Sequence, residues 1–305
     1  MNWLGVAAVI GAVIVMVGVL VTTAALSVRV DGEAVAAPPI ARSAPPTTTT
    51  TTSAASTSAA PTTMTPAKPA TIAPSARPAQ PAVAANCANP AFSSAKAGEG
   101  WSNGAYYVQN NMWNMSGYSV SQQLAACTAR NWSVTTNADN NSGDGAVKTY
   151  PNVNKDYHDW NTGKEPPLSQ FSRLASTFAA TAPRTGIYNV AYDIWLNGVP
   201  GNREVMIWTE NHRQTPSGKR VAGGLPFSGS TWDLYATDSN EYLAFIPSRP
   251  LTSGTLDLKG FLNYLVDNGR VPANSTLGQI CFGVEIVSTE GNPATFRVTD
   301  FSVID

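Results

Sequence analysis

Closely spaced short β-strands are the feature that most restricts how the C-terminal part of this chain can fold. Runs rich in Val, Ile, Tyr, Trp and Thr alternate with turn residues, as in "IYNVAYDIWL", "REVMIWTE", "QICFGVEIVS" and "ATFRVTDFSVI". Many short strands separated by turns are typical of a β-sandwich or barrel. We therefore expect one all-β domain over residues 86–305.

One segment of this domain has a helical period instead. Asp257 can cap its start, and Asn268 with Gly269 can end it. We expect a single amphipathic helix packed on the outer side of a sheet. The apolar residues that recur at helical spacing are Leu258, Phe261, Leu262 and Leu265.

The N-terminal third has a different composition. Residues 3–26 carry no charged side chain and are long enough to span a bilayer, so we expect residues 1–30 to be a transmembrane anchor or a signal segment. Residues 31–85 consist largely of Pro, Ala, Thr and Ser, which bury too little apolar surface to fold. We expect them to be a disordered linker.

Charge and cysteine content exclude several functions. The formal net charge is −1 and the chain has no block of Lys and Arg, which argues against a nucleic-acid partner. The three cysteines and two histidines match no metal-binding spacing, so we expect neither a metal nor another cofactor. In an exported chain, three cysteines are most simply one disulfide and one free thiol.

Three acidic residues lie in the middle of hydrophobic strand patterns. Any one of them could face solvent or pair with a distant arginine. Three such acids, with little basic charge nearby, indicate a functional site. By the two-residue period of a strand, each shares a face with apolar side chains: Glu204 with Met206 and Trp208, Asp193 with Ala191 and Trp195, and Glu285 with Cys281 and Val287.

Glycoside hydrolysis needs two carboxyl groups and no metal, imidazole or thiol. One carboxylic acid protonates the leaving oxygen, and one carboxylate attacks the sugar or activates water. Aromatic rings are also needed, because the C–H faces of sugars stack on them. The sequence supplies Trp113 and Trp208 on predicted strands and Trp160 in a predicted loop.

Four motifs in order resemble glycoside hydrolase family 12: "YYVQNNMW" at 106–113, "AYDIW" at 191–195, "EVMIW" at 204–208 and "FGVEI" at 282–286. The resemblance covers nearly all of residues 87–305. It implies a β-jelly-roll (concanavalin A-like) sandwich of two curved antiparallel sheets, with one helix on the convex side. It also implies endo-acting hydrolysis of β-1,4-glucan with retention of configuration.

The same resemblance implies roles for the three acids. Glu204 matches the nucleophile and Glu285 the acid/base, while Asp193 matches an acid that holds the nucleophile in position. We expect Glu285 to stay protonated while Glu204 is ionised, because two close carboxyls do not both ionise freely.

Further residues correspond to the family's substrate cleft and to its disulfide. The motif implies a sugar platform at Trp113, and the loop "TPSG" departs from the form common in relatives. That departure and the short loop "NGVPGN" leave the preferred glucan open, and Cys281 matches no family role. The implied substrate-binding residues are Asn111, Trp113, Met206, Trp208, Pro216 and Gly218, and the implied disulfide joins Cys87 and Cys127.

The sequence thus favours a retaining endo-β-1,4-glucanase whose substrate is a β-glucan polysaccharide. A glycan-binding module is the alternative, because jelly-roll sandwiches also serve as lectins. A lectin needs the aromatic residues but not the acid pair. A structural envelope protein would leave the acid pair unexplained. We expect a monomer that is secreted or anchored to the cell envelope or membrane, with the catalytic domain outside.

Overall fold

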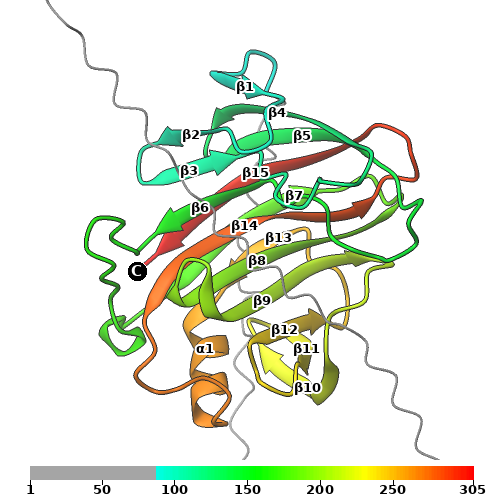
Figure 1. The fold of residues 1–305 in the computed structure, drawn as a ribbon. Coiled ribbons are helices and arrows are strands. Elements are labelled where there is room, and N and C mark those ends of the chain that lie inside the picture. Colours follow the sequence, from blue (N-terminus) through cyan, green and yellow to red (C-terminus); the bar gives the residue numbers. More distant parts are fainter. Residues whose placement is uncertain (1–86) are drawn as a thin grey trace, which may run out of the picture. The chain divides into compact units, whose positions relative to one another are not determined.

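The computed structural model describes residues 87–305, which form two β-sheets packed face to face (Figure 1). The predicted membrane or signal segment, residues 1–30, and the predicted linker, residues 31–85, lie outside the described residues. Within residues 87–305 no helix has the length and apolarity needed to cross a membrane. The expected all-β class is confirmed for the part of the chain that is described.

The smaller sheet has six strands in the spatial order β1-β4-β5-β15-β7-β13. All of its neighbouring strands are antiparallel. Its members are β1 (Phe92–Ser94), β4 (Val120–Thr128), β5 (Asn131–Ala138), β7 (Ala175–Thr181), β13 (Ser253–Leu256) and β15 (Ala294–Ile304).

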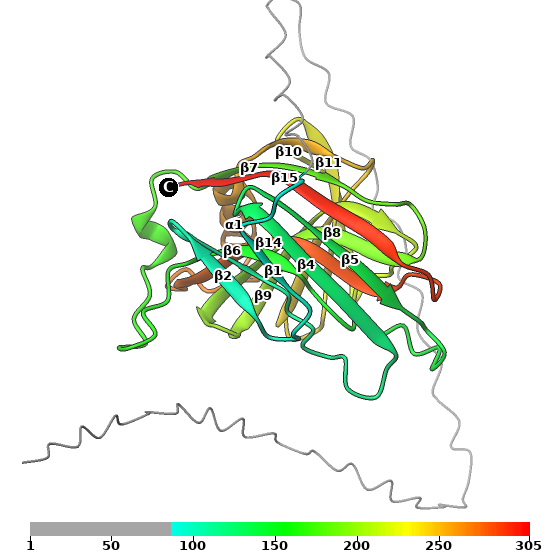
Figure 2. The ribbon, with the colours of Figure 1, turned by 90° about the horizontal axis from the view of Figure 1, so that it is seen from above.

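The larger sheet has nine strands in the order β10-β11-β12-β9-β8-β14-β6-β3-β2. Figure 2 shows β4, β5 and β15 of the smaller sheet lying over β8 and β14 of the larger one. The members of the larger sheet are β2 (Gly100–Asn103), β3 (Tyr106–Gln109), β6 (Asn152–Asp156), β8 (Ile187–Gly198), β9 (Gly201–His212), β10 (Lys219–Phe227), β11 (Ser230–Ala236), β12 (Tyr242–Pro247) and β14 (Leu277–Ser288).

One strand pair departs from the antiparallel sheets that we expected. β12 runs parallel to β9, with Tyr242 opposite Glu204 and Phe245 opposite Ile207. The reason is topological. β10, β11 and β12 form an antiparallel meander, and its third strand returns to the edge of β9 in the direction of β9 itself.

The core lies between the two sheets, and strand alternation decides which residues enter it. On β8, β9 and β14, Tyr192, Ile207 and Phe282 are fully buried in this core. Phe282 lies 5.5 Å from Phe178 and 6.0 Å from Phe301 of the smaller sheet, measured between ring centroids. The opposite face of the same three strands therefore remains available for a site. We call it the cleft face.

The predicted helix is confirmed as α1 (Leu258–Asp267). Asp257 caps it by accepting a hydrogen bond from the backbone N–H of Gly260, and Asn268 follows its last turn. The four residues predicted for its apolar side are buried in the core between the sheets. Phe261 packs on Phe227, Trp232 and Phe245 of β10, β11 and β12, so the helix covers the face of the larger sheet that lies opposite the cleft face. A short 3-10 turn, η1 (Leu168–Gln170), precedes β7.

A disulfide joins Cys87 to Cys127, with 5.6 Å between their Cα atoms. It ties the start of the described chain to the end of β4. Cys281 is a free thiol on β14 and is buried.

Phe261 tests the role of the helix in the core. Its ring centroid lies 4.5 Å from that of Phe227 and 4.9 Å from that of Phe245, so removing it leaves a cavity between helix and sheet. We expect Phe261→Ala to lower the free energy of unfolding by about 3–5 kcal/mol, measured by urea denaturation. Asn263→Ala, on the exposed side of α1, is the matched control and should change it by less than about 0.5 kcal/mol. Equal effects would contradict this role.

Candidate active site

Three adjacent strands carry the three predicted acids on the cleft face. Asp193 lies on β8, Glu204 on β9 and Glu285 on β14, and β8 is the middle strand of the three. Asp193 pairs with Met206 of β9, so it is a diagonal neighbour of Glu204. On its other side it pairs with Cys281 of β14.

Glu204 and Glu285 are offset along the sheet. Glu204 lies opposite Trp195 and Glu285 opposite Asn189, and these two positions are six residues apart on β8. A flat sheet would separate them by roughly 20 Å along the strand direction. The β8–β9 pairing has a bulge between Val190 and Ala191, and bulges bend and twist strands. Both glutamates nevertheless line one cavity of about 490 Å³.

This cavity, which we call the acid cavity, contains all three acids and two of the predicted substrate-binding residues, Asn111 and Trp113. Trp113 was expected on a strand, and that expectation is wrong. β3 ends at Gln109, and Asn111 adopts a positive φ of 36°, which turns the chain. Trp113 is 63% exposed and borders the cavity from this turn. The remaining lining residues are Gln109, Tyr150, Asn152, Trp195, Val199, Pro200, Gln279 and Cys281.

Met206 and Trp208 do not line the cavity, contrary to the expectation. They share the cleft face with Glu204 but are 1% and 0% exposed. They pack with Ala191 and Ala244 in a separate apolar cluster. The Nε1–H of Trp208 donates to the Sδ of Met206 at 3.5 Å. These residues therefore support the floor beside Glu204 and do not contact solvent.

Pro216 and Gly218 are likewise absent from the cavity wall. Gly218 ends the loop between β9 and β10 with a φ of 78°, and a Cβ there would lie 2.2 Å from the carbonyl oxygen of Ala236. Close packing against Ala236 thus keeps Gly218 on the β11 side. The same loop instead contributes Gln214, whose Nε2 donates to Oε2 of Glu285 at 3.3 Å.

Burial and mutual repulsion raise the pKa values of the acids on β8 and β9. The pKa of Glu204 rises to about 7, first through burial and then through the negative charge of Glu285. The pKa of Asp193 rises well above its ordinary value, first through burial and then through the charges of Glu204 and Glu285. Burial among like charges thus favours the protonated, neutral form of Asp193. Its Oδ1 is buried without a hydrogen-bond partner among the described residues.

Glu285 has a different environment. Burial also raises its pKa, but hydrogen bonds from Asn189 and Gln214 partly offset the increase. The Nδ2 of Asn189 donates to Oε2 of Glu285 at 2.5 Å. No side chain in residues 87–305 donates in this way to Glu204. In this substrate-free cavity the two hydrogen bonds thus favour the charged form of Glu285, while burial raises the pKa values of both glutamates.

The sequence pattern does not identify three polar residues that shape the site. Asn189 lies four residues before Asp193 on β8 and therefore points to the same face, so a search of that face could have found it. Gln214 lies in a loop, where no period exists. Tyr150 is buried, lines the cavity and donates its hydroxyl to the carbonyl of Ala191 at 3.0 Å.

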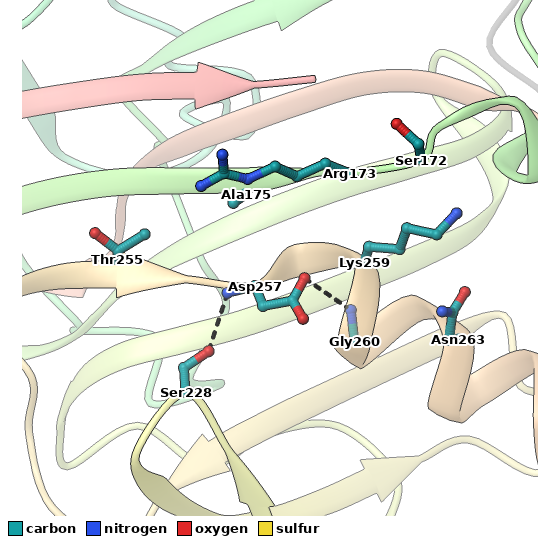
Figure 3. Close-up of a pocket in the computed structure, with 9 residues that line it drawn as sticks. All are labelled: Ser172, Arg173, Ala175, Ser228, Thr255, Asp257, Lys259, Gly260 and Asn263. Carbon is teal, nitrogen blue, oxygen red and sulfur yellow. Dashed lines mark hydrogen bonds between the residues drawn. The ribbon is translucent and has the colours of Figure 1, made fainter.

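Another depression lies around the N-terminus of α1 (Figure 3). It contains Asp257, Lys259 and Arg173 but none of the predicted site residues. The Nζ of Lys259 donates hydrogen bonds to the backbone carbonyls of Leu168 and Phe171. Within residues 87–305 no group of three or more His, Cys, Asp or Glu could hold a metal ion.

Comparison with known proteins gives one family. The profile of glycosyl hydrolase family 12 matches residues 104–304, which is more than half of the chain and includes all three acids.

Individual relatives agree with this match. The chain is 27% identical over 215 residues to xyloglucan-specific endo-beta-1,4-glucanase A of Emericella nidulans, covering 66% of this chain and 85% of that protein. It is 24% identical over 214 residues to endoglucanase S of Pectobacterium parmentieri, covering 62% of this chain and 78% of that protein.

Solved structures share the fold. Endoglucanase cel12A from Rhodothermus marinus superimposes with a TM-score of 0.61 at 27% identity, covering 70% of this chain and 97% of that one. The xyloglucanase domain of NopAA from Sinorhizobium fredii, solved with cellobiose, gives a TM-score of 0.62 at 24% identity, covering 71% and 99%.

The hydrogen bond from Asn189 provides a test of the electrostatics. It stabilises the charged form of Glu285, so its loss should raise the pKa of Glu285. We expect this increase in Asn189→Ala, followed by ¹³C NMR titration of the labelled carboxyl group. Gln214→Ala removes the longer bond and should give a smaller increase. A decrease in either variant would contradict the assignment.

The raised pKa of Glu204 also predicts how stability depends on pH. The folded pKa of about 7 exceeds the ordinary value of 4.5, so wild-type stability should fall as the pH rises between these values. Glu204→Gln lacks this titration. The free energy of unfolding of Glu204→Gln minus that of wild type should therefore be about 2 kcal/mol larger above pH 7 than below pH 4.5. Comparing the two pH values cancels the fixed cost of the substitution. A pH-independent difference would refute this explanation.

Proposed function

The chain belongs to glycosyl hydrolase family 12, and we propose that it hydrolyses β-1,4-glucan chains internally, with Glu204 as nucleophile and Glu285 as acid/base. The observation that carries these roles is the pair of half-buried glutamates on one cavity, beside a neutral Asp193. The family match favours this function over the glycan-binding alternative, which does not need the acid pair.

In the first step, the carboxylate of Glu204 forms a bond to the anomeric carbon. The bond from that carbon to the glycosidic oxygen breaks, and the oxygen takes the proton of Glu285. In the second step, Glu285 accepts a proton from water, whose oxygen attacks the same carbon. Glu204 leaves as a carboxylate. Two displacements on opposite faces retain the configuration.

The reaction needs the proton on Glu285 and the charge on Glu204. In the substrate-free cavity the pKa values of both glutamates are raised, and the charge of Glu285 acts on Glu204, so the order of ionisation belongs to the pair. A bound sugar places its glycosidic oxygen beside Glu285 and excludes water. We expect this contact to favour the protonated form of Glu285 and to move the charge to Glu204.

Asp193 positions the nucleophile in this proposal. The structure shows no hydrogen bond between the described carboxyls of Asp193 and Glu204. They are diagonal neighbours, and a neutral Asp193 carries a proton that it can donate. Donation to Glu204 would stabilise the ionised nucleophile and fix its rotamer.

Trp113 supplies the sugar platform, because its ring is exposed at the cavity edge. Similar proteins are named both as xyloglucan-specific enzymes and as endoglucanases, so we propose a β-1,4-glucan backbone as the common substrate. Parallel assays of reducing-sugar release from carboxymethylcellulose, barley β-glucan and xyloglucan test both the activity and the preference. No release from any of them would refute the function.

We also propose that the catalytic domain works outside the cytoplasm as a monomer. The Cys87–Cys127 disulfide supports an oxidising compartment. The monomeric state stays a prediction. Whether residues 1–30 serve as an anchor or as a cleaved signal stays a prediction.

Replacing each glutamate should separate the two roles. Glu204→Ala removes the nucleophile and should abolish turnover of every substrate. Glu285→Ala should keep partial activity on aryl glycosides, because a good leaving group needs no proton. Added azide should raise the rate of Glu285→Ala and give a β-glycosyl azide, identified by ¹H NMR.

The reciprocal experiment is the control. Azide added to Glu204→Ala should yield no β-azide, because that variant forms no covalent intermediate with retained geometry. Full activity of Glu285→Ala on polymeric glucan, or an α-configured first product from wild type, would overturn the proposed roles.

A further inference from the structure

Tyr150 is the cross-strand neighbour of Glu285 on the cleft face. The register between the segment before β6 and β14 places it there, because the residues between two known pairs match one to one. Side chains directly opposite each other on neighbouring strands have Cβ atoms about 4.5–5.5 Å apart. Glu285 therefore has Asn189 of β8 on one side and Tyr150 on the other. The two pairs that fix the register are Thr149 with Ile286 and Asn152 with Gly283.

The side chain of Tyr150 reaches across β14 to β8. It is 5% exposed and lines the acid cavity, and its hydroxyl donates to the backbone carbonyl of Ala191 at 3.0 Å. Ala191 is the β8 partner of Gly283, so the ring crosses β14 at the level of Gly283. A Cβ on Gly283 would lie 2.2 Å from the carbonyl oxygen of Pro151. The missing side chain thus lets the segment that carries Tyr150 approach β14 closely.

The carboxyl group of Glu285 is fixed by hydrogen bonds through only one of its oxygens. Its Oε2 accepts from Asn189 at 2.5 Å and from Gln214 at 3.3 Å. Within residues 87–305 its Oε1 has no side-chain hydrogen-bond partner. Oε1 is therefore the oxygen that can carry the proton. A carboxyl held by one oxygen can still swing about it, and the ring of Tyr150 occupies the side toward β6.

The phenol of Tyr150 stays neutral among the acids. Its pKa is raised well above the ordinary value, first through burial and then through negative charge on its neighbours. These neighbours are Cys281, Asp193, Glu285 and Glu204, in decreasing order of their effect. A neutral phenol remains a hydrogen-bond donor. Its bond to the Ala191 carbonyl can therefore persist through the changes of charge that the reaction requires.

We propose that Tyr150 is a positioning residue for the acid/base: its ring, tied to Ala191 across Gly283, keeps Oε1 of Glu285 directed at the glycosidic oxygen. This inference rests on the proposed function. Proton transfer needs the donor within hydrogen-bond reach of the leaving oxygen, and a small displacement lowers the rate strongly. Tyr150 exchanges no proton with the substrate. Without the tie, protonation of the leaving group should weaken while attack by Glu204 continues.

The dependence on the leaving group tests this role in the full-length protein. Dinitrophenyl cellobioside loses its phenol without a proton, whereas phenyl cellobioside needs one. Their kcat/KM values report the first bond cleavage. Tyr150→Phe removes only the hydroxyl and should lower kcat/KM about tenfold for the phenyl compound but less than about twofold for the dinitrophenyl compound. Tyr150→Ala also removes the ring and should give a larger loss on the phenyl compound.

Tyr192→Phe is the matched control. Tyr192 is also buried in the larger sheet and donates its hydroxyl to Oγ of Ser176 at 2.9 Å, but it lies on the core face. Each Phe variant thus loses one buried hydrogen bond, and urea denaturation measures the effect on stability. Tyr192→Phe should change kcat/KM for both aryl cellobiosides by the same factor, less than about twofold.

The outcomes separate this role from the alternatives. An equal loss on both aryl cellobiosides in Tyr150→Phe would refute it, because such a loss indicates a general structural effect. A higher KM with unchanged kcat on both would also refute it, because the hydroxyl would then bind the sugar. Wild-type values in Tyr150→Phe would show that the tie is not needed. A folded wild type inactive on every β-glucan and aryl cellobioside would refute the proposed function as well, whereas an active wild type leaves that function standing.

Discussion

The burial of three carboxyl groups on one sheet face is the constraint on which this structure depends. An isolated carboxylate in an apolar site is costly, and here the cost appears as raised pKa values for Asp193, Glu204 and Glu285. The opposite face of the same strands supplies the compensating stability, because it forms the continuous apolar core between the sheets. Strand alternation thus places the chemistry and the stabilising core on opposite sides of the same backbone.

Curvature is the second requirement. Glu204 and Glu285 lie at strand positions that a flat sheet would keep well apart, yet both line one cavity. The β8–β9 register shifts between Val190 and Ala191, where Thr209 of β9 is the extra residue, and such a bulge increases the local twist. Because the shape comes from a packed sheet and not from loops, the two acids are held by rigid elements, as a precise catalytic geometry requires.

The parts of the fold that follow local rules could be predicted from the sequence. The apolar spacing of the helix and its Asp257 cap both lie within one short segment of the sequence. The period of two in each strand assigns Glu204 and Glu285 to one face. Depth of burial could not be predicted. The period of two correctly places Trp208 on the cleft face, but Ala191 and Ala244 from neighbouring strands pack against it and bury it completely. The hydrogen bonds from Asn189 and Gln214 to Glu285 are likewise long-range contacts.

Cys281, which matched no family role, starts a chain of hydrogen bonds that runs from the cavity floor on β14 to the end of β6. Its thiol pKa is raised well above the ordinary value, chiefly by burial, so it is a neutral donor beside Asp193. It donates to Oε1 of Gln279 at 3.0 Å, and Nε2 of Gln279 donates to Asp156. Asp156 in turn accepts from Trp160. A negative thiolate at this position would add a like charge to three coupled acids, whereas a neutral thiol fills the space and orients Gln279. The neutral thiol therefore adds no charge beside the acids, and the chain of hydrogen bonds that it starts ends on the indole of Trp160.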